Sequence, residues 1–204
     1  MIAIVDFGMG NLGSIRNMLA KIGAESVITS DPRAIEAADK LILPGVGAFD
    51  RAMENLHRAG LVTVLNDKVV ARKTPLLGIC LGMQLLSRRS EEGSLPGLGW
   101  IAADTVRFPA EIDGVRLTVP HMGWNTITVT QPAALLGQVG PDPRFYFVHS
   151  YHVRCEREAD VAATAHHGIT FHAAVASGNI VGTQFHPEKS HKFGLALLRS
   201  FVEW

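Results

Sequence analysis

The sequence predicts an α/β fold built on a mixed, mostly parallel β-sheet with an antiparallel section. Two observations lead to this prediction. In the first half of the chain, short apolar runs alternate with helical patterns, which is typical of parallel strands joined by helices. In the second half, strand patterns follow one another with little helix between them. No repeat, low-complexity tract or linker divides the 204 residues, so we expect one domain over residues 1–204.

The elements of the first half are predicted from local patterns. Residues 1–6 form an apolar, strand-like run, and a glycine-rich turn separates it from a helix over 14–22 whose apolar residues recur on one face. Asp31 and Pro32 form a turn that opens a further helix. The other elements expected here are strands at 26–29, 40–43 and 76–79, and helices near 48–57 and 61–71.

The second half opens with a polar, glycine-rich loop over 88–99 and closes with a helix over 192–204 that carries several apolar side chains. Between these segments, β-branched and aromatic residues are typical of strands. The strands expected there are 105–108, 115–119, 125–130, 145–153, 161–165, 169–176 and 180–185. They supply the antiparallel section of the sheet.

The composition excludes several classes of protein. Lysine plus arginine and aspartate plus glutamate each number 19, so the balanced charge gives no general attraction to nucleic acid or an anionic membrane. The first residues lack the basic region of a signal peptide, and no apolar stretch is long enough to span a bilayer. The two cysteines, Cys80 and Cys155, do not suggest a disulfide framework. We therefore expect a cytoplasmic protein.

The stretch 74–86 contains the strongest chemical signal. A short apolar run changes into helix-forming residues at Cys80, with Gly78 two residues before it and Gly82 two after. This is the layout of a nucleophile elbow, a sharp strand-to-helix turn that needs small neighbours. The positive end of the following helix would stabilise a thiolate. The alternative is a buried structural cysteine at a glycine-punctuated strand end.

A thiol nucleophile needs a base, and the base needs an orienting group. His186 ends the apolar strand predicted over 180–185, and Pro187 keeps His186 extended. Residues two apart in an extended chain point to the same side, so Glu188 can accept a hydrogen bond from one ring nitrogen. The other nitrogen is then left for the sulfur of Cys80.

Two further patterns have simpler explanations. Gly8, Gly10 and Gly13 match a dinucleotide-binding pattern, but a tight turn near some other site is the better interpretation, because short glycine patterns are frequent. Seven other histidines have structural explanations as surface, turn or strand residues, including the pair His166 and His167 near His172. No acidic residue or cysteine stands at a recognised ligand spacing, so we expect no metal and no cofactor.

Five segments resemble a known family. Residues 75–86 and 182–190 resemble the two signatures of class I glutamine amidotransferases, which have Cys-His-Glu triads. Residues 44–49, 120–125 and 146–151 are similar to segments of one branch, the glutaminase subunits of imidazole glycerol phosphate synthases in histidine biosynthesis. The resemblance covers essentially the whole chain and implies a single three-layer, flavodoxin-like domain.

The resemblance also implies roles for individual residues. Cys80 would attack the side-chain amide of glutamine, His186 would handle the protons, and Glu188 would orient His186. The oxyanion of the tetrahedral intermediate would be bound by N–H groups at Leu81 and in the segment 44–47. Within that segment Val46 and Gly47 are the candidates, and a peptide flip there would be set by the partner. The residues that would hold glutamine are Gln84, Glu92, Ser150 and Tyr151.

The implied partner is a barrel-shaped cyclase subunit, in a heterodimer that channels ammonia. The residues that match the surface facing this cyclase are Met122, Trp124, Asn125 and Lys189. Arg88 and Arg89 depart from the acidic or small residues expected there, and Thr183 replaces the more usual valine. Cys155 fits no motif and is expected to be structural. Two alternatives remain: another cysteine hydrolase or glutaminase, such as that of an anthranilate or GMP synthase, and a non-catalytic regulatory subunit.

Overall fold

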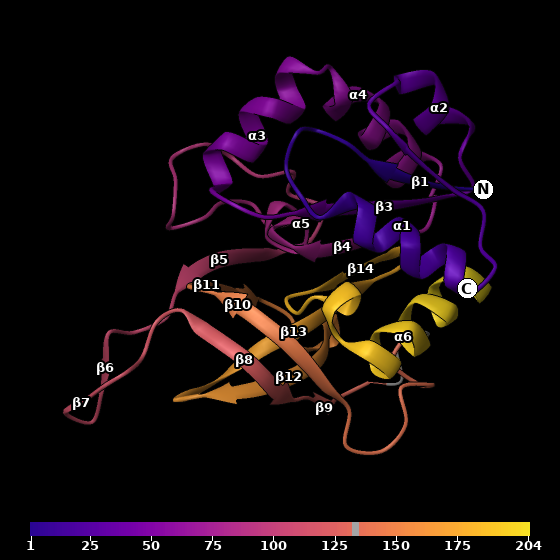
Figure 1. Ribbon diagram of the computed structural model, residues 1–204. Helices are drawn as coiled ribbons and strands as arrows, with labels where there is room; N and C mark the ends of the chain where they lie inside the picture. Colours follow the sequence, from indigo (N-terminus) through magenta and orange to yellow (C-terminus); the bar gives the residue numbers. More distant parts are fainter. Residues whose placement is uncertain (132–134) are drawn as a thin grey trace.

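The central feature of the computed structural model is an eight-stranded sheet in the order β2-β1-β3-β4-β14-β13-β12-β9 (Figure 1). The structure describes residues 1–131 and 135–204. Neighbouring strands are parallel from β2 through β1, β3 and β4 to β14. From β14 through β13 and β12 to β9, neighbouring strands are antiparallel. The sheet strands are β1 (Ile2–Val5), β2 (Ser26–Thr29), β3 (Lys40–Gly45), β4 (Leu76–Cys80), β9 (Thr128–Val129), β12 (Val161–His167), β13 (Ile169–Ser177) and β14 (Ile180–Thr183). The predicted fold class is therefore confirmed.

Helices cover the two faces of this sheet, as Figure 1 shows. Helices α1 and α6 pack together on one face, whereas α2, α3 and α4 form a group on the other. The helical elements are α1 (Leu12–Lys21), α2 (Pro32–Ala37), α3 (Phe49–Arg58), α4 (Leu61–Leu65), the π-helical η1 (Asn66–Ala71), α5 (Leu81–Leu85), the 3₁₀ turns η2 (Glu158–Asp160) and η3 (Pro187–Lys189), and α6 (His191–Glu203).

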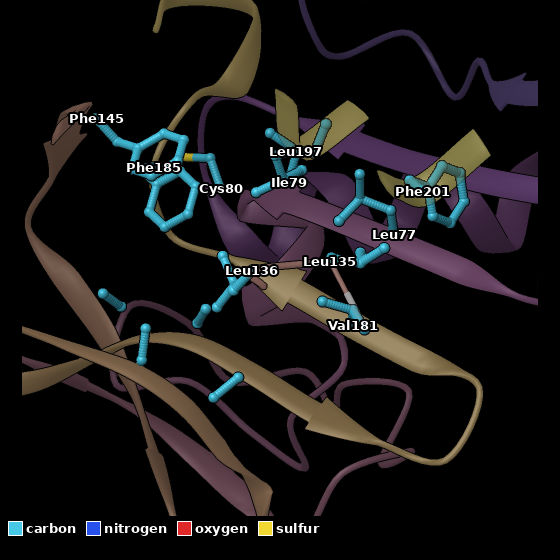
Figure 2. Packing of buried hydrophobic residues seen from close by; sticks show 14 of the residues in the cluster. Leu77, Ile79, Cys80, Leu135, Leu136, Phe145, Val181, Phe185, Leu197 and Phe201 are labelled. Carbon is cyan, nitrogen blue, oxygen red and sulfur yellow. The ribbon is translucent and has the colours of Figure 1, made fainter. Parts of the chain in front are cut away.

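The two faces have separate cores because the side chains of a strand alternate between them. In β1, Ile2 and Ile4 belong to the cluster beneath α1 and α6, whereas Ala3 and Val5 belong to the cluster beneath α2, α3 and α4. Figure 2 shows the first cluster, where the rings of Phe145 and Phe185 stack with their centroids 3.9 Å apart. Cys80 belongs to the same cluster, at the end of a completely buried strand.

Six short strands form three additional two-stranded ribbons. They are β5 (Ala103–Arg107) with β11 (Tyr151–Cys155), β8 (His121–Thr126) with β10 (Arg144–His149), and β6 (Glu111–Ile112) with β7 (Val115–Arg116). The β6–β7 ribbon projects from the body of the molecule in Figure 1. The ribbons β5–β11 and β8–β10 lie beside the antiparallel half of the sheet and bring segment 146–151 to the carboxyl end of β4.

Four sequence predictions of single strands were wrong in extent. The strand predicted over 180–185 ends at Thr183. The strand predicted over 145–153 is divided at Ser150 into β10 and β11, which pair with different partners. The carbonyl of Ser150 accepts a hydrogen bond from Phe108 N–H instead of joining either ladder. The strand predicted over 125–130 is interrupted at Ile127, and that over 115–119 keeps only two strand residues. Apolar patterning continues through these breaks, so it could not locate them.

The β4–α5 turn is packed closely against β3, and this explains its glycines. A side chain at Gly82 would overlap the carbonyl oxygen of Leu43 in the neighbouring strand. A Cβ at Gly78 would lie 2.9 Å from the carbonyl oxygen of Gly82. Both glycines are therefore required by close backbone approach, which allows Cys80 to sit at the tip of the turn.

We expect Gly82→Ala to lower the free energy of unfolding by about 3 kcal/mol or more, because the backbone of β3 or α5 must move. The matched control is Gly13→Ala in α1, where a Cβ would meet no atom within 4 Å. Removing glycine from a helix should raise the stability there by about 0.5–1 kcal/mol. Urea unfolding of both variants measures the difference. A Gly82→Ala variant as stable as the control would contradict this packing.

Candidate active site

Cys80 occupies a strained turn at the end of β4. Its backbone has φ 55° and ψ −110°, a left-handed conformation that is uncommon outside glycine, and α5 begins at the next residue. Backbone strain of this kind is frequent where a nucleophile must project from a fold. The side chain is 6% exposed and lines a cavity of about 400 Å³. That volume suits a small-molecule ligand.

His186 lines this cavity, and Glu188 pairs with its ring. Nδ1 of His186 is 2.8 Å from Oε1 of Glu188, and both side chains are buried. Burial lowers the pKa of His186, but the interactions of its ring with Cys80 and Glu188 outweigh this effect and raise the pKa to about 9. Among the described residues, Nε2 of His186 has no hydrogen-bond partner of ordinary geometry, so it remains free for proton exchange with the sulfur.

The His186–Glu188 contact is as expected, but the reason given from the sequence was wrong. His186 itself is extended, with φ −101° and ψ 97°, whereas Pro187–Lys189 form the 3₁₀ turn η3 and not a continuing strand. Ser190 fixes this turn, because its Oγ donates to the carbonyl of His186 and accepts from Tyr146 N–H. His186 N–H also donates to the carbonyl of Tyr146 in β10.

Gln184 is a neighbour of the nucleophile that the sequence reasoning missed. Its Nε2 lies 3.7 Å from Cys80 Sγ, and the side chain is completely buried. A signal was available: Gln184 precedes His186 by two residues, and the alternation of the strand predicted over 180–185 would put both side chains on the same side, although β14 ends at Thr183. A donor on the sulfur favours the thiolate over the thiol.

All four residues expected to hold glutamine line the same cavity. Glu92 Oε2 accepts a hydrogen bond from Phe49 N–H at the start of α3. Gln84 Nε2 donates to the carbonyl of Tyr151 and to Oε1 of Gln184. Ser150 and Tyr151 stand at the break between β10 and β11. The cavity therefore has acceptors and donors on several sides, as an amino-acid ligand requires.

The residues expected to bind the oxyanion also lie at the cavity. Val46 and Gly47 follow β3, and Leu81 follows Cys80. Gly47 has φ +110°, and Val46 is 42% exposed. The first glycine-rich turn supports this loop, because a Cβ on Gly47 would contact the end of the Met9 side chain. That turn therefore lies against a neighbouring loop, as the simpler interpretation of its glycines predicted.

Of the four residues expected to face a partner, three are exposed and one is turned inward. Met122 and Trp124 in β8 are 62% and 48% exposed, and Lys189 is exposed beside them, with Nζ 5.6 Å from the ring of Tyr146. Trp124 stacks on His191 at a centroid distance of 5.5 Å. Asn125 differs, because its Nδ2 is turned inward to His121 and to the carbonyl of His166.

The structure explains several residues that depart from the family pattern or fit no motif. Arg88 and Arg89 both pair with Asp104, and Arg88 also pairs with Glu156, so the basic residues close the loop after α5. The hydroxyl of Thr183 donates to the carbonyl of Phe185. Burial raises the pKa of Cys155 to about 12, which fits an unreactive thiol.

The histidines require a correction. His149 lines the cavity and His152 lies in another strand, whereas both were expected in one strand. His166 and His167 end β12 beside the turn at Gly168, as expected, whereas His172 lies inside β13 and not near a turn. In residues 1–131 and 135–204, no three histidine, cysteine, aspartate or glutamate side chains are arranged to hold a metal ion.

This arrangement can carry out nucleophilic acyl chemistry. The nucleophile and its histidine come from the carboxyl ends of neighbouring parallel strands, β4 and β14, and the adjacent strand β3 delivers the 46–47 loop. Ligand sites in open α/β sheets are found at this edge. A thiol, a carboxylate-bound imidazole and nearby N–H groups are the parts that acyl transfer through a covalent intermediate requires.

The fold is shared with solved structures. It matches a crystal structure described as that of a putative GMP synthase subunit from Thermoplasma acidophilum, with TM-score 0.73, 20% identity, and coverage of 99% of this chain and 92% of that one. A glutamine amidotransferase from Thermotoga maritima matches with TM-score 0.69, 15% identity, and coverage of 100% and 98%. At these identities the likeness shows the fold alone.

The family model for glutamine amidotransferase class-I matches residues 3–204, so the chain belongs to that family. It is 53% identical to imidazole glycerol phosphate synthase subunit HisH 2 of Methanococcus maripaludis, over 100% of this chain and 99% of the relative. The corresponding protein of Pseudomonas aeruginosa is 48% identical with the same coverage, and HisH of Leptospira interrogans is 45% identical over 99% of each chain. Within its class, the chain is a member of the HisH subunits, as the sequence resemblance implied.

Proposed function

We propose that this chain hydrolyses glutamine to glutamate and ammonia, with Cys80 as nucleophile, His186 as proton carrier and Glu188 as its orienting group. The observation that carries the proposal is that Cys80 and His186, about a hundred residues apart in the chain, line one cavity, with Glu188 bound to the His186 ring. The family to which the chain belongs supports the choice of glutamine as substrate.

The reaction proceeds in two steps. The Cys80 thiolate attacks the side-chain amide carbon, and imidazolium His186 protonates the departing nitrogen, so ammonia leaves and a γ-glutamyl thioester remains. Forming the thioester removes the sulfur charge that helps to raise the pKa of His186. The now neutral imidazole takes a proton from water, the resulting hydroxide attacks the thioester, and glutamate leaves. Thiolate and imidazolium are restored.

The tetrahedral intermediates of both steps carry an oxyanion. Leu81 N–H and an N–H of the Val46–Gly47 loop are the proposed donors, each worth roughly 3–4 kcal/mol in the transition state. Gly45 and Gly47 on either side of Val46 allow the peptide to rotate, since Gly47 already has a positive φ. We assign this loop the role of responding to the partner subunit.

The proposed partner is the cyclase subunit of an imidazole glycerol phosphate synthase, which would use the ammonia inside a heterodimer. Met122, Trp124 and Lys189 offer an exposed apolar and cationic surface next to the strands that line the cavity. Transfer within a complex keeps ammonia unprotonated and away from water. In the described part of the chain, no helix is long and apolar enough to cross a membrane. A cytoplasmic location stays a prediction.

The partner surface is tested with Trp124→Ala, using Val70→Ala as control. Both residues are large, apolar and close to half exposed, but Val70 lies on η1, outside the proposed surface. Losing a Trp anchor should weaken cyclase binding about 30-fold, or about 2 kcal/mol, whereas Val70→Ala should change it less than about twofold. Calorimetric titration measures binding, and glutamine hydrolysis with and without the cyclase measures activation.

We expect hydrolysis to be slow in the isolated chain and faster in the complex. Full activity without the cyclase would contradict the proposed role of the 46–47 loop. Equal binding by both variants would place the interface elsewhere. Binding to an anthranilate or GMP synthase partner and not to the cyclase would favour the alternative assignment. The identity to HisH subunits over the full length favours the cyclase.

A further inference from the structure

A continuous series of hydrogen bonds runs through the buried region between β8 and the cavity. His149 Nδ1 lies 2.8 Å from the carbonyl oxygen of Tyr151, and His149 Nε2 lies 3.0 Å from His121 Nδ1. His121 Nε2 in turn lies 3.2 Å from Asn125 Nδ2. His121 and His149 are each 6% exposed, so water cannot substitute freely for these partners.

The direction of every bond in this series is fixed by chemistry. A carbonyl oxygen only accepts, so His149 must carry its proton on Nδ1. A neutral imidazole has a single N–H, so His149 Nε2 is an acceptor and His121 Nδ1 must donate to it. The same reasoning makes His121 Nε2 an acceptor for the Asn125 amide. Burial lowers the pKa of His121 to about 4 and that of His149 well below its ordinary value, so both rings are neutral near pH 7.

The hydrogen bonds of Asn125, at the other end of the series, give the same proton positions independently. Asn125 Nδ2 lies 2.8 Å from the carbonyl oxygen of His166, which again can only accept. The amide of Asn125 must therefore turn its NH₂ group inward, where its second proton reaches His121 Nε2. Asn125 belongs to β8, whose residues Met122 and Trp124 are exposed. The series thus begins on the strand that carries the proposed partner surface.

A second branch leaves the Tyr151 carbonyl toward the nucleophile. This oxygen also accepts from Gln84 Nε2 at 3.1 Å, which fixes the orientation of the Gln84 amide. The other proton of Gln84 Nε2 goes to Gln184 Oε1 at 3.1 Å. Gln184 must then present Nε2, and not its oxygen, to Cys80 Sγ at 3.7 Å. The orientation of a donor on the sulfur is therefore set by bonds that reach back to β8.

We propose that His121 and His149 are positioning residues for Cys80, acting through the Tyr151 carbonyl, Gln84 and Gln184. This six-residue series is called the β8–Cys80 network: Asn125, His121, His149, Tyr151, Gln84 and Gln184. It holds an N–H against the sulfur, which favours the thiolate, and it connects that N–H to the exposed strand β8. The inference rests on the proposed role of Cys80 as nucleophile. It deepens that role, because a partner that moves β8 would also alter the donor on the sulfur.

The first test is the tautomeric state of the two histidines in the unmodified protein. Nitrogen-15 NMR of the isolated, histidine-labelled chain near neutral pH should show the proton on Nδ1 in both His121 and His149. An imidazole that only filled space could take either tautomer. The Nε2–H form in either ring would overturn the network, because one bond in the series would then join two acceptors or two donors.

The second test compares two substitutions of His121. In His121→Asn the side-chain amide can donate to His149 from the place of Nδ1, whereas His121→Leu fills similar volume without a donor. The readout is alkylation of Cys80 by iodoacetamide across pH in the isolated chain. Mass spectrometry identifies the modified cysteine, and the pKa of about 12 for Cys155 keeps that thiol slow.

We expect His121→Leu to slow alkylation near neutral pH about tenfold and to move its midpoint to higher pH, with His121→Asn within about twofold of the parent. A merely structural role would lower thermal stability without moving the pH profile. Equal rates in the two variants would overturn the proposal, and if His121→Leu does not fold, the tautomer measurement decides. Neither test needs glutamine or the cyclase, so failure of the network is distinguishable from failure of the proposed function.

Discussion

Cys80→Ala is expected to abolish glutamine-dependent activity, with a fall of about 10⁴- to 10⁶-fold, because no thioester can form without the sulfur. In complex with the cyclase, synthesis from added ammonium should be retained, since ammonia from solution replaces the product of this chain. The two nitrogen sources are compared in one assay of the synthase product at mildly alkaline pH, where more of the ammonium is unprotonated.

The control for this substitution is Cys155→Ala, which removes the other thiol of the chain. Cys155 is half-buried at the end of β11 and takes no part in the proposed reaction, so glutamine-dependent activity should persist. Alanine at position 80 meets the same backbone strain as cysteine, so the turn should survive. If both nitrogen sources failed equally in Cys80→Ala, the side chain would be holding the fold together.

The sequence was sufficient where the chemistry depends on neighbouring residues. Gly78, Cys80 and Gly82 predicted the strained turn because their spacing reflects a steric requirement, which the structure shows as close approach of Gly78 to the start of α5 and of Gly82 to β3. His186 and Glu188 predicted their contact for a similar reason, although the intervening backbone is a 3₁₀ turn. Local sequence thus identified which side chains meet, even where it misjudged the backbone between them.

The sequence was insufficient where a role depends on pairing between distant segments. His149 reaches the cavity because β10 pairs with β8 and ends at His149, before the break at Ser150. Neither fact is visible in the alternation of residues over 145–153. Gln184 touches Cys80 because β14 lies next to β4. Strand pairing across about a hundred residues depends on the whole fold, so histidine and glutamine here looked like ordinary strand residues.

Glu188→Gln is expected to reduce glutamine hydrolysis by about 10³- to 10⁴-fold without removing any atom of the nucleophile or the base. In the parent, Glu188 Oε1 accepts the proton on Nδ1 of His186 at 2.8 Å, which leaves Nε2 for the sulfur. A glutamine amide can instead donate to Nδ1, which moves the imidazole proton to Nε2 and blocks proton transfer from the thiol. The control is Glu54→Gln, which removes an exposed carboxylate on α3 and should leave hydrolysis unchanged.

The pH dependence distinguishes this role from simple packing. Cys80 and Glu188 raise the pKa of His186 from 6.5 to about 9, against the effect of burial. A raised pKa in the folded state stabilises the protein fully below about pH 6.5, and the contribution is lost as pH rises through about 9. Without the Glu188 charge, the effect of burial is opposed less, so the pKa of His186 is lower. Its contribution to the stability of the folded state should then be lost at a lower pH.

Urea unfolding and Cys80 alkylation across this range measure the two consequences. The stability lost in Glu188→Gln should be largest below about pH 6.5 and should diminish above about pH 9, where His186 is neutral in the parent as well. The imidazolium that favours the thiolate would also be lost at a lower pH, so rapid alkylation should begin at a higher pH in the variant. A loss of stability that is the same at every pH, with an unchanged alkylation profile, would mean that Glu188 fills space and does not set the charge of His186.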